Sequence, residues 1–163
     1  MPVRVFLDSN VILYAHSITE PGKRGIAQSL PIQYDAIIST QVLSEVGNVF
    51  TRKLRLPPAE AKHRVAALAD GCDLLTVTEA IILDTFRIVE KYRYGFYDSQ
   101  IIAAALASGA EILLTEDMQH GQVIDGVLTI QSPFAPAAHQ RQQRYRVKSG
   151  RPVRKPASKQ GER

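Results

Sequence analysis

The sequence has a single cysteine and no long apolar segment, and these absences exclude several classes of protein. Because Cys72 has no possible partner within the chain, an internal disulfide framework is ruled out, and a reducing compartment is favoured. The longest apolar stretch, residues 101–114, is interrupted by Glu111 and is shorter than the roughly 18 residues of a membrane span. Strand-like sequence already begins at Val3, so no secretory signal is visible. We therefore expect a cytoplasmic protein with no membrane association.

Two common binding signatures are also missing. Cys72 and the four histidines show no zinc-ligand spacing. The glycine-rich segment Pro21-Gly22-Lys23-Arg24-Gly25 lacks the Lys-Ser/Thr pair of a P-loop, and we expect it to form a loop before a helix. Any metal site predicted for this chain therefore has to use oxygen ligands.

Charge is distributed unevenly along the chain. Residues 1–140 contain 11 Lys/Arg and 15 Asp/Glu, whereas residues 141–163 contain nine Lys/Arg and one Glu. The basic segment has almost no apolar residues to bury, so we expect it to be disordered. The length fits one domain and a tail, which we place at residues 1–135 and 136–163. The tail's charges suit contact with RNA, with the acidic body or with a partner protein.

Strand-like and helix-like segments alternate along the chain. Short β-rich runs occur at residues 3–7, 36–39, 73–77, 111–115 and 127–131. Helical patterns separate most of them, and Pro57-Pro58 should start a further helix. Such alternation predicts an α/β fold with a mainly parallel sheet that is covered on both faces. The helical apolar stripes contain Val42, Val46, Val49 and Phe50; Ile81, Ile82, Thr85, Ile88 and Val89; and Ile101, Ile102, Ala105 and Leu106, the last closed by Gly109.

Four acidic residues occupy notable positions in this framework. Asp8 ends the first strand and Asp117 follows the fourth, and in open α/β sheets the binding crevice lies beyond the carboxyl ends of the strands. Glu45 lies on the border of one apolar helical stripe and Asp98 near the centre of another. Each has an ordinary alternative: Asp98 as a helix N-cap, Asp117 as a turn residue and Glu45 on a solvated flank. Asp8 is harder to explain, since a buried strand end seldom needs a charge.

Convergence of these carboxylates would require a counter-charge. Two carboxylates about 4 Å apart repel each other by about 4 kcal/mol at an effective dielectric of about 20. Three or four acids in one cleft must therefore take up protons or hold a cation. Because the available ligands are all oxygens, Mg²⁺ or Mn²⁺ is favoured.

Four segments together resemble the PIN domain family, and most closely its VapC-type toxins. The resemblance covers about residues 3–132 and depends on the order and spacing of Phe6-Leu7-Asp8-Ser9-Asn10-Val11, Ser44-Glu45-Val46, Tyr97-Asp98-Ser99-Gln100-Ile101 and Leu114-Thr115-Glu116-Asp117-Met118-Gln119-His120-Gly121. It implies a three-layer sandwich with a five-stranded parallel sheet in the order 3-2-1-4-5. It also implies a Mg²⁺- or Mn²⁺-dependent ribonuclease, a small antitoxin as partner and a homodimer.

The resemblance also implies roles for individual residues. The family's catalytic acids correspond to Asp8, Glu45, Asp98 and Asp117. Of these, Asp8, Asp98 and Asp117 would ligate the metal, and Glu45 would ligate a second ion or orient water. Asn10 and Thr115 match supporting positions, and Glu116 is a candidate helper outside the ligand set.

A segment of alternating basic and aromatic residues leads directly into Asp98. Basic side chains can follow phosphates and aromatic rings can stack on bases, so we interpret this segment as an RNA-binding element. The alternative is an ordinary helix end with aromatic residues in the core. The residues concerned are Lys91, Tyr92, Arg93, Tyr94 and Tyr97.

Three other functions compete with the toxin nuclease. An aspartate-nucleophile phosphatase or dehalogenase also begins with a strand ending in Asp, but its Asp-x-Asp pattern fails at Asn10. A PIN-like fold without catalysis would be an RNA- or partner-binding module. A nuclease with an RNA-processing or DNA-cutting role would keep the chemistry but not the toxin function.

Overall fold

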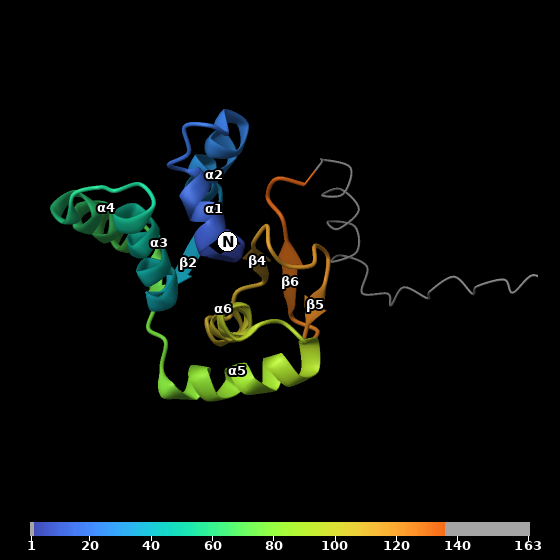
Figure 1. Ribbon diagram of the computed structural model, residues 1–163. Coiled ribbons are helices and arrows are strands. Elements are labelled where there is room, and N and C mark those ends of the chain that lie inside the picture. Colours follow the sequence, from blue (N-terminus) through green and yellow to red (C-terminus); the bar gives the residue numbers. More distant parts are fainter. Residues whose placement is uncertain (1, 136–163) are drawn as a thin grey trace, which may run out of the picture.

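The computed structural model describes residues 2–135, and the predicted basic tail, residues 136–163, lies outside the described residues. Strands and helices alternate through most of the chain (Figure 1). The strands are β1 (Arg4–Leu7), β2 (Asp35–Ser39), β3 (Asp73–Leu75), β4 (Ile112–Leu114), β5 (Val123–Ile124) and β6 (Leu128–Gln131). The helices are α1 (Ser9–Tyr14), α2 (Pro21–Gln33), α3 (Thr40–Arg52), α4 (Pro58–Asp70), α5 (Glu79–Tyr92) and α6 (Phe96–Ala107).

The strands form one sheet in the order β3-β2-β1-β4-β6-β5. All neighbouring pairs are parallel except β5 and β6, which are antiparallel. The predicted parallel order 3-2-1-4-5 is confirmed, with β6 as its fifth strand. The antiparallel β5 was not predicted, because two residues are too few to show an alternating pattern.

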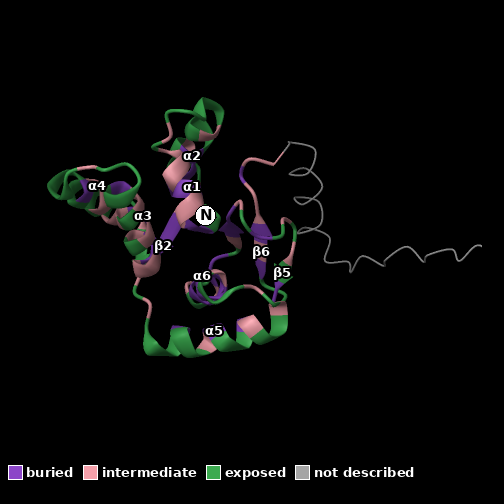
Figure 2. Cartoon of the chain, viewed as in Figure 1, coloured by how far each residue is buried: buried purple, intermediate pink, exposed green. Residues whose placement is uncertain are grey.

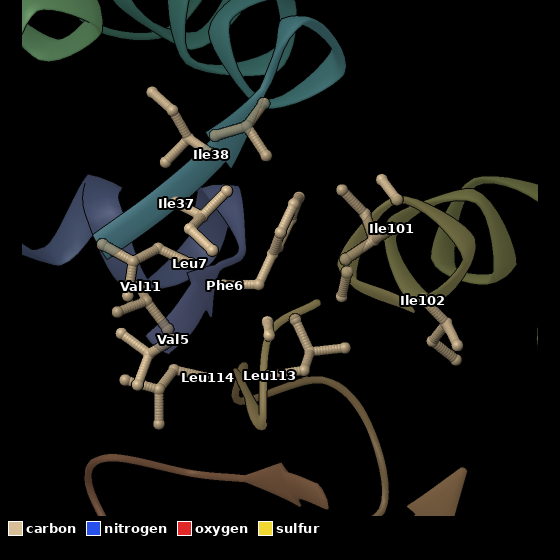
Figure 3. Close-up of a cluster of buried hydrophobic side chains, with 14 of the residues drawn as sticks. Val5, Phe6, Leu7, Val11, Ile37, Ile38, Ile101, Ile102, Leu113 and Leu114 are labelled. Atoms are coloured by element: carbon tan, nitrogen blue, oxygen red, sulfur yellow. The ribbon is translucent and has the colours of Figure 1, made fainter. Parts of the chain in front are cut away.

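Side chains of the central strands alternate between the two faces of the sheet. Val5 and Leu7 point to the face covered by α1, whereas Phe6 points to the face covered by α6 (Figure 3). Phe6 pairs in register with Leu113 of β4, and the two lie on the same face beside Ile101. The alternation therefore gives each layer of helices its own apolar core (Figure 3).

The helices form the outer layers of the sandwich. Helix α6 lies against the sheet and is buried along most of its length, whereas α5 packs on its outer side and exposes one face (Figure 2). The predicted stripe on α5 is correct for Ile81, Thr85 and Ile88, but Ile82 is 40% exposed. Within residues 2–135, no helix combines the length and apolar character needed to cross a membrane.

Several helix ends follow the sequence signals. Helix α4 begins at Pro58, as expected, and α6 ends before Gly109, whose φ of +72° is the left-handed conformation typical of a helix C′ position. The prediction for residues 21–25 was wrong. They form the first turns of α2, with Pro21 at the first helical position, where a missing N–H removes no intrahelical bond.

Candidate functional site

Asp8 lies where the central strand β1 meets α1. It is only 5% exposed and caps the helix, because its Oδ1 accepts a 2.7 Å hydrogen bond from the backbone N–H of Ser9. Its Oδ2 accepts a 2.8 Å bond from the buried hydroxyl of Thr115, which directly follows the neighbouring strand β4. The carboxylate is therefore held on both sides at the carboxyl edge of the sheet.

Asn10 joins Asp8 to Asp117. Its Nδ2 lies 3.2 Å from Oδ2 of Asp8 and 2.9 Å from Oδ2 of Asp117. Its Oδ1 accepts a 3.2 Å bond from the backbone N–H of Glu116, which ties α1 to the loop after β4. The amide therefore has the orienting contacts that the resemblance implies, and it brings two of the predicted acids around one atom.

Glu45 reaches the same edge from α3. Its Oε2 accepts a 2.5 Å hydrogen bond from the hydroxyl of Ser9, the residue next to Asp8. Its Oε1 accepts a 2.8 Å bond from Nε2 of Gln41, one turn earlier on the same helix. The side chain is half-buried, as expected for the border of an apolar stripe.

Asp98 enters from the first turn of α6. The helix begins at Phe96 and Gly95 occupies the N-cap position, so the alternative that Asp98 is the N-cap residue is wrong. A carboxylate in the first turn interacts favourably with the helix dipole. Asp98 is half-buried, whereas Asp117 is exposed.

The charges of these four acids act on one another. Burial, together with the nearby charges of Glu45 and Asp98, raises the pKa of Asp8 to about 6, although the hydrogen bonds from Thr115 and Ser9 act in the opposite direction. Burial likewise raises the pKa of Asp98, together with the charges of Asp117 and Glu45. Each predicted acid therefore belongs to one electrostatic cluster, in which additional positive charge would be favourable.

The donor set of this cluster fits a hard divalent cation, since it contains only carboxylate, amide and hydroxyl oxygens. As they stand, no three Asp, Glu, His or Cys side chains among the described residues lie close enough together to hold an ion jointly. The carboxylate oxygens of Asp8, Asp117 and Glu45 accept hydrogen bonds from Ser9, Asn10, Thr115 and Gln41.

Glu116 pairs with Lys23 of α2. The two charged atoms are 2.6 Å apart, and the Lys23 ammonium also lies 4.5 Å from the centroid of the Tyr14 ring. The second carboxylate oxygen of Glu116, Oε2, is buried and has no hydrogen-bond partner among the described residues. The contacts of Glu116 are therefore those of a residue that fixes the loop after β4 to α2.

The predicted RNA-binding residues divide into two groups. Lys91 and Tyr92 both hydrogen-bond to Asp125, and the Tyr94 hydroxyl donates to Oε1 of Gln122. These contacts attach the end of α5 to the β5–β6 hairpin, as the alternative of an ordinary helix end suggests. Arg93, at the left-handed end of α5, and Tyr97, 70% exposed beside Asp98, have their side chains open to solvent.

Three residues near the acids were not predicted to have a role. Ser9 bridges Asp8 and Glu45, Gln41 binds Glu45, and Gln100 of α6 donates a 2.7 Å bond to Gln41. The contact between Gln41 and Glu45 could have been predicted, because residues four apart in a helix are neighbours on its surface. The contact between Gln41 and Gln100, 59 residues apart, had no sequence signal.

A mostly apolar groove adjoins the acidic cluster. It has a volume of about 620 Å³ and lies between α1, the loop after it and the end of α3. Asn10 is among its lining residues, and Lys53 is its one cation among the described residues. The remaining walls include Leu13, Ile18, Val49 and Leu54.

The fold and the acidic edge of the sheet define a class of protein that comparison with known families identifies. The PIN domain family matches residues 5–124, which are most of the chain. The chain therefore belongs to the PIN domain family. No curated protein sequence matches it.

Solved structures share the fold at low sequence identity. A toxin–antitoxin complex from Klebsiella pneumoniae is 20% identical, with a TM-score of 0.60 over 80% of this chain and 98% of the other. DNA-bound VapBC from Salmonella typhimurium is 19% identical, with a TM-score of 0.59 over 80% and 98%. VapC20 from Mycobacterium tuberculosis, a toxin that cleaves the sarcin–ricin loop, is 18% identical, with a TM-score of 0.57 over 69% and 89%.

Proposed function

We propose that this protein is a divalent-metal-dependent endoribonuclease. The observation that supports the proposal is the coupled charge of Asp8, Glu45, Asp98 and Asp117 at the carboxyl edge of a PIN-domain sheet. Burial and neighbouring carboxylates raise the pKa of Asp8 and of Asp98, and such raised values are typical of sites that hold a cation or exchange protons. Oxygen ligands favour Mg²⁺ or Mn²⁺ over zinc.

Each acid has a separate role in this proposal. Asp8, Asp98 and Asp117 hold the ion, and Glu45 orients water or contributes to a second ion. A divalent ion at this position supplies charge stabilisation to a phosphodiester under attack and lowers the pKa of the attacking water. Asn10 and Thr115 keep Asp8 and Asp117 in position through their hydrogen bonds, and the products carry a 5′-phosphate and a 3′-hydroxyl.

The RNA strand is proposed to pass beside the start of α6. Tyr97 is exposed next to Asp98, and its ring lies 5.6 Å from that of Phe96. An exposed ring beside the acids can stack on a base that flanks the scissile phosphate. Arg93 is open to solvent nearby and suits a phosphate contact, whereas Lys91, Tyr92 and Tyr94 act indirectly by holding the end of α5.

The proposal is tested by cleavage of a labelled single-stranded RNA with purified wild type, Asp8→Asn and Asp70→Asn. Asp70 is an exposed acid at the end of α4 and serves as the matched control. We expect wild type and Asp70→Asn to cut the RNA in Mg²⁺ or Mn²⁺ and to stop when the ion is chelated. Asp8→Asn should be inactive while its circular dichroism spectrum is unchanged.

The competing functions give different results in the same experiment. Cleavage by Asp8→Asn at the wild-type rate contradicts the assignment of the site. RNA that is bound but never cut, with any divalent ion, supports the non-catalytic binding module. Cleavage of DNA in preference to RNA would point to the non-toxin nuclease.

We also propose that the protein is the toxin of a toxin–antitoxin pair and forms a homodimer. Support comes from the neighbours in structure, which include toxin–antitoxin complexes. Expression with and without the neighbouring gene, followed by growth measurement and mapping of RNA ends, tests the toxin role. Light scattering of the purified protein tests the dimer, and a mass of one chain contradicts it.

The apolar groove beside Asn10 is proposed to receive the antitoxin. Its walls are apolar, and Ile18 is 89% exposed and Leu54 48% exposed at its rim. A partner seated there would lie against the acidic cluster and block it. Ile18→Lys and Leu54→Lys should weaken antitoxin binding and leave RNA cleavage unchanged. If both variants bind the antitoxin with the affinity of wild type, this location is contradicted.

A further inference from the structure

Gln41 of α3 and Gln100 of α6 form a hydrogen-bonded pair at the edge of the acidic cluster. Gln100 Nε2 donates a 2.7 Å bond to Oε1 of Gln41. Gln41 Nε2 in turn lies 2.8 Å from Oε1 of Glu45 and 3.2 Å from the carbonyl oxygen of Tyr97. The pair therefore connects the helix that contains Glu45 to the residue that precedes Asp98.

We propose that Gln41 and Gln100 are positioning residues that hold the Glu45 carboxylate in its working orientation. The inference rests on the proposed function, because it assigns these residues a part in the same reaction. Neither glutamine touches the reacting atoms, and both act through Glu45.

The direction of the contacts supports this role. A glutamine amide can face a carboxylate with its NH₂ group, which attracts, or with its oxygen, which repels. Because Gln100 donates to the oxygen of Gln41, the NH₂ group of Gln41 must face Glu45. Gln100 is only 9% exposed, so packing in α6 limits its movement. The contacts of Gln41 with Gln100, Glu45 and the Tyr97 carbonyl all agree with this one orientation of the Gln41 amide.

The effect on Glu45 follows from its two oxygens. Ser9 donates to Oε2 and Gln41 to Oε1, so the carboxylate is held from both sides by neutral donors. Hydrogen bonds to an ionised carboxylate are stronger than those between neutral groups. Without Gln41 the carboxylate would rotate about its side-chain bonds, and a small misplacement of a catalytic group lowers the rate steeply.

The experiment compares Gln41→Met and Gln100→Met with wild type and with the control Gln33→Met. Methionine keeps a similar length and removes the donors, and Gln33 is an exposed glutamine whose amide contacts only Ser29 among the described residues. We expect kcat for RNA cleavage to fall about tenfold or more in Gln41→Met and Gln100→Met. KM and the thermal midpoint should stay close to wild type, and Gln33→Met should match wild type throughout.

A double-mutant cycle separates positioning from a purely structural role. If the pair acts through Glu45, adding Gln100→Met to Glu45→Gln should cause no further loss of kcat. A second loss of the same size in the double variant overturns the proposal. So does an unchanged kcat in Gln41→Met.

A spectroscopic readout tests the pair independently of catalysis. In ¹⁵N-labelled protein, the side-chain amide signals of Gln41 should shift in both Gln100→Met and Glu45→Gln, and not in Gln33→Met. Unshifted signals in the first two variants overturn the proposal. If wild type cuts no RNA at all, the proposed function fails, and these amide signals still decide whether the pair holds Glu45.

Discussion

The hydroxyl of Thr115 donates a 2.8 Å hydrogen bond to Oδ2 of Asp8, and this contact joins the ends of the two central strands. The strands β1 and β4 are parallel, and Leu7 pairs with Leu114, so the next residue of each strand meets the other at the sheet edge. Parallel pairing thus brings a hydroxyl and a carboxylate together from distant parts of the chain.

Thr115→Val should weaken both the fold and the site. Valine keeps the shape of threonine but cannot donate to Asp8, and both residues are buried. We expect a loss of about 1–3 kcal/mol in unfolding free energy at pH 7, measured with urea, together with slower RNA cleavage. Thr115→Ser keeps the hydroxyl and should lie close to wild type. Equal stability of Thr115→Val and wild type would show that the hydrogen bond contributes nothing.

The raised pKa of Asp8 predicts a specific dependence of stability on pH. A rise from 3.8 to about 6 means that the folded protein binds the Asp8 proton more tightly than the unfolded chain does. This contribution is fully present below pH 4 and disappears as the pH rises through 6. In chelator, the unfolding free energy of wild type relative to Asp8→Asn should therefore fall by about 2 kcal/mol between pH 4 and pH 7. A constant difference over that range contradicts the shifted pKa.

Removing Lys23 should leave Glu116 without its ion-pair partner in a partly covered position. The side chains are 27% and 32% exposed, so the pair is screened only in part. We expect Lys23→Met to lower the thermal midpoint, and the double variant with Glu116→Gln to recover much of that loss. Thermal unfolding of wild type, Lys23→Met, Glu116→Gln and the double variant measures the coupling between the two side chains. Purely additive effects would mean that the pair has no net interaction.

The exposed ring of Tyr97 should contribute to RNA affinity. A stacked base is worth about 1–3 kcal/mol, so Tyr97→Ala should raise the Kd for a single-stranded RNA at least about fivefold. The control is Tyr94→Phe, which loses the bond to Gln122 and should lower stability without a comparable change in affinity. The binding is measured by fluorescence anisotropy in chelator, so that no cleavage occurs. If Tyr94→Phe binds RNA more weakly than Tyr97→Ala, the assignment of RNA stacking to Tyr97 and of a structural role to Tyr94 is contradicted.

The sheet order and its acidic edge were predictable because they depend on patterns along single segments. The apolar runs before Asp8 and before Asp117 mark two strands, and parallel topology then brings their ends to one edge. The start of α2 was not predicted because Gly22 and Gly25 are typical of a loop. Pro21 is nevertheless compatible with a helix, since it occupies the first helical position.

Contacts between segments without a shared pattern were not predictable. The pairing of Lys91 and Tyr92 with Asp125 requires the tight turn between β5 and β6, where Asp125 and Gly126 have φ values of +48° and +74°. The Asp-Gly pair was a signal for such a turn. Nothing in the sequence indicated that this turn would meet the end of α5, or that Gln41 would meet Gln100.

The central claim, that acids from separate elements act as one divalent-ion site, is tested most directly by titrating Mn²⁺ into the purified protein and following the free ion by electron paramagnetic resonance. Wild type, Asp8→Asn, Asp98→Asn and the control Asp70→Asn are compared at pH 7. We predict that wild type and Asp70→Asn bind Mn²⁺ equally, and that either active-site variant binds it at least about tenfold more weakly. Equal affinity in all four proteins would contradict the account.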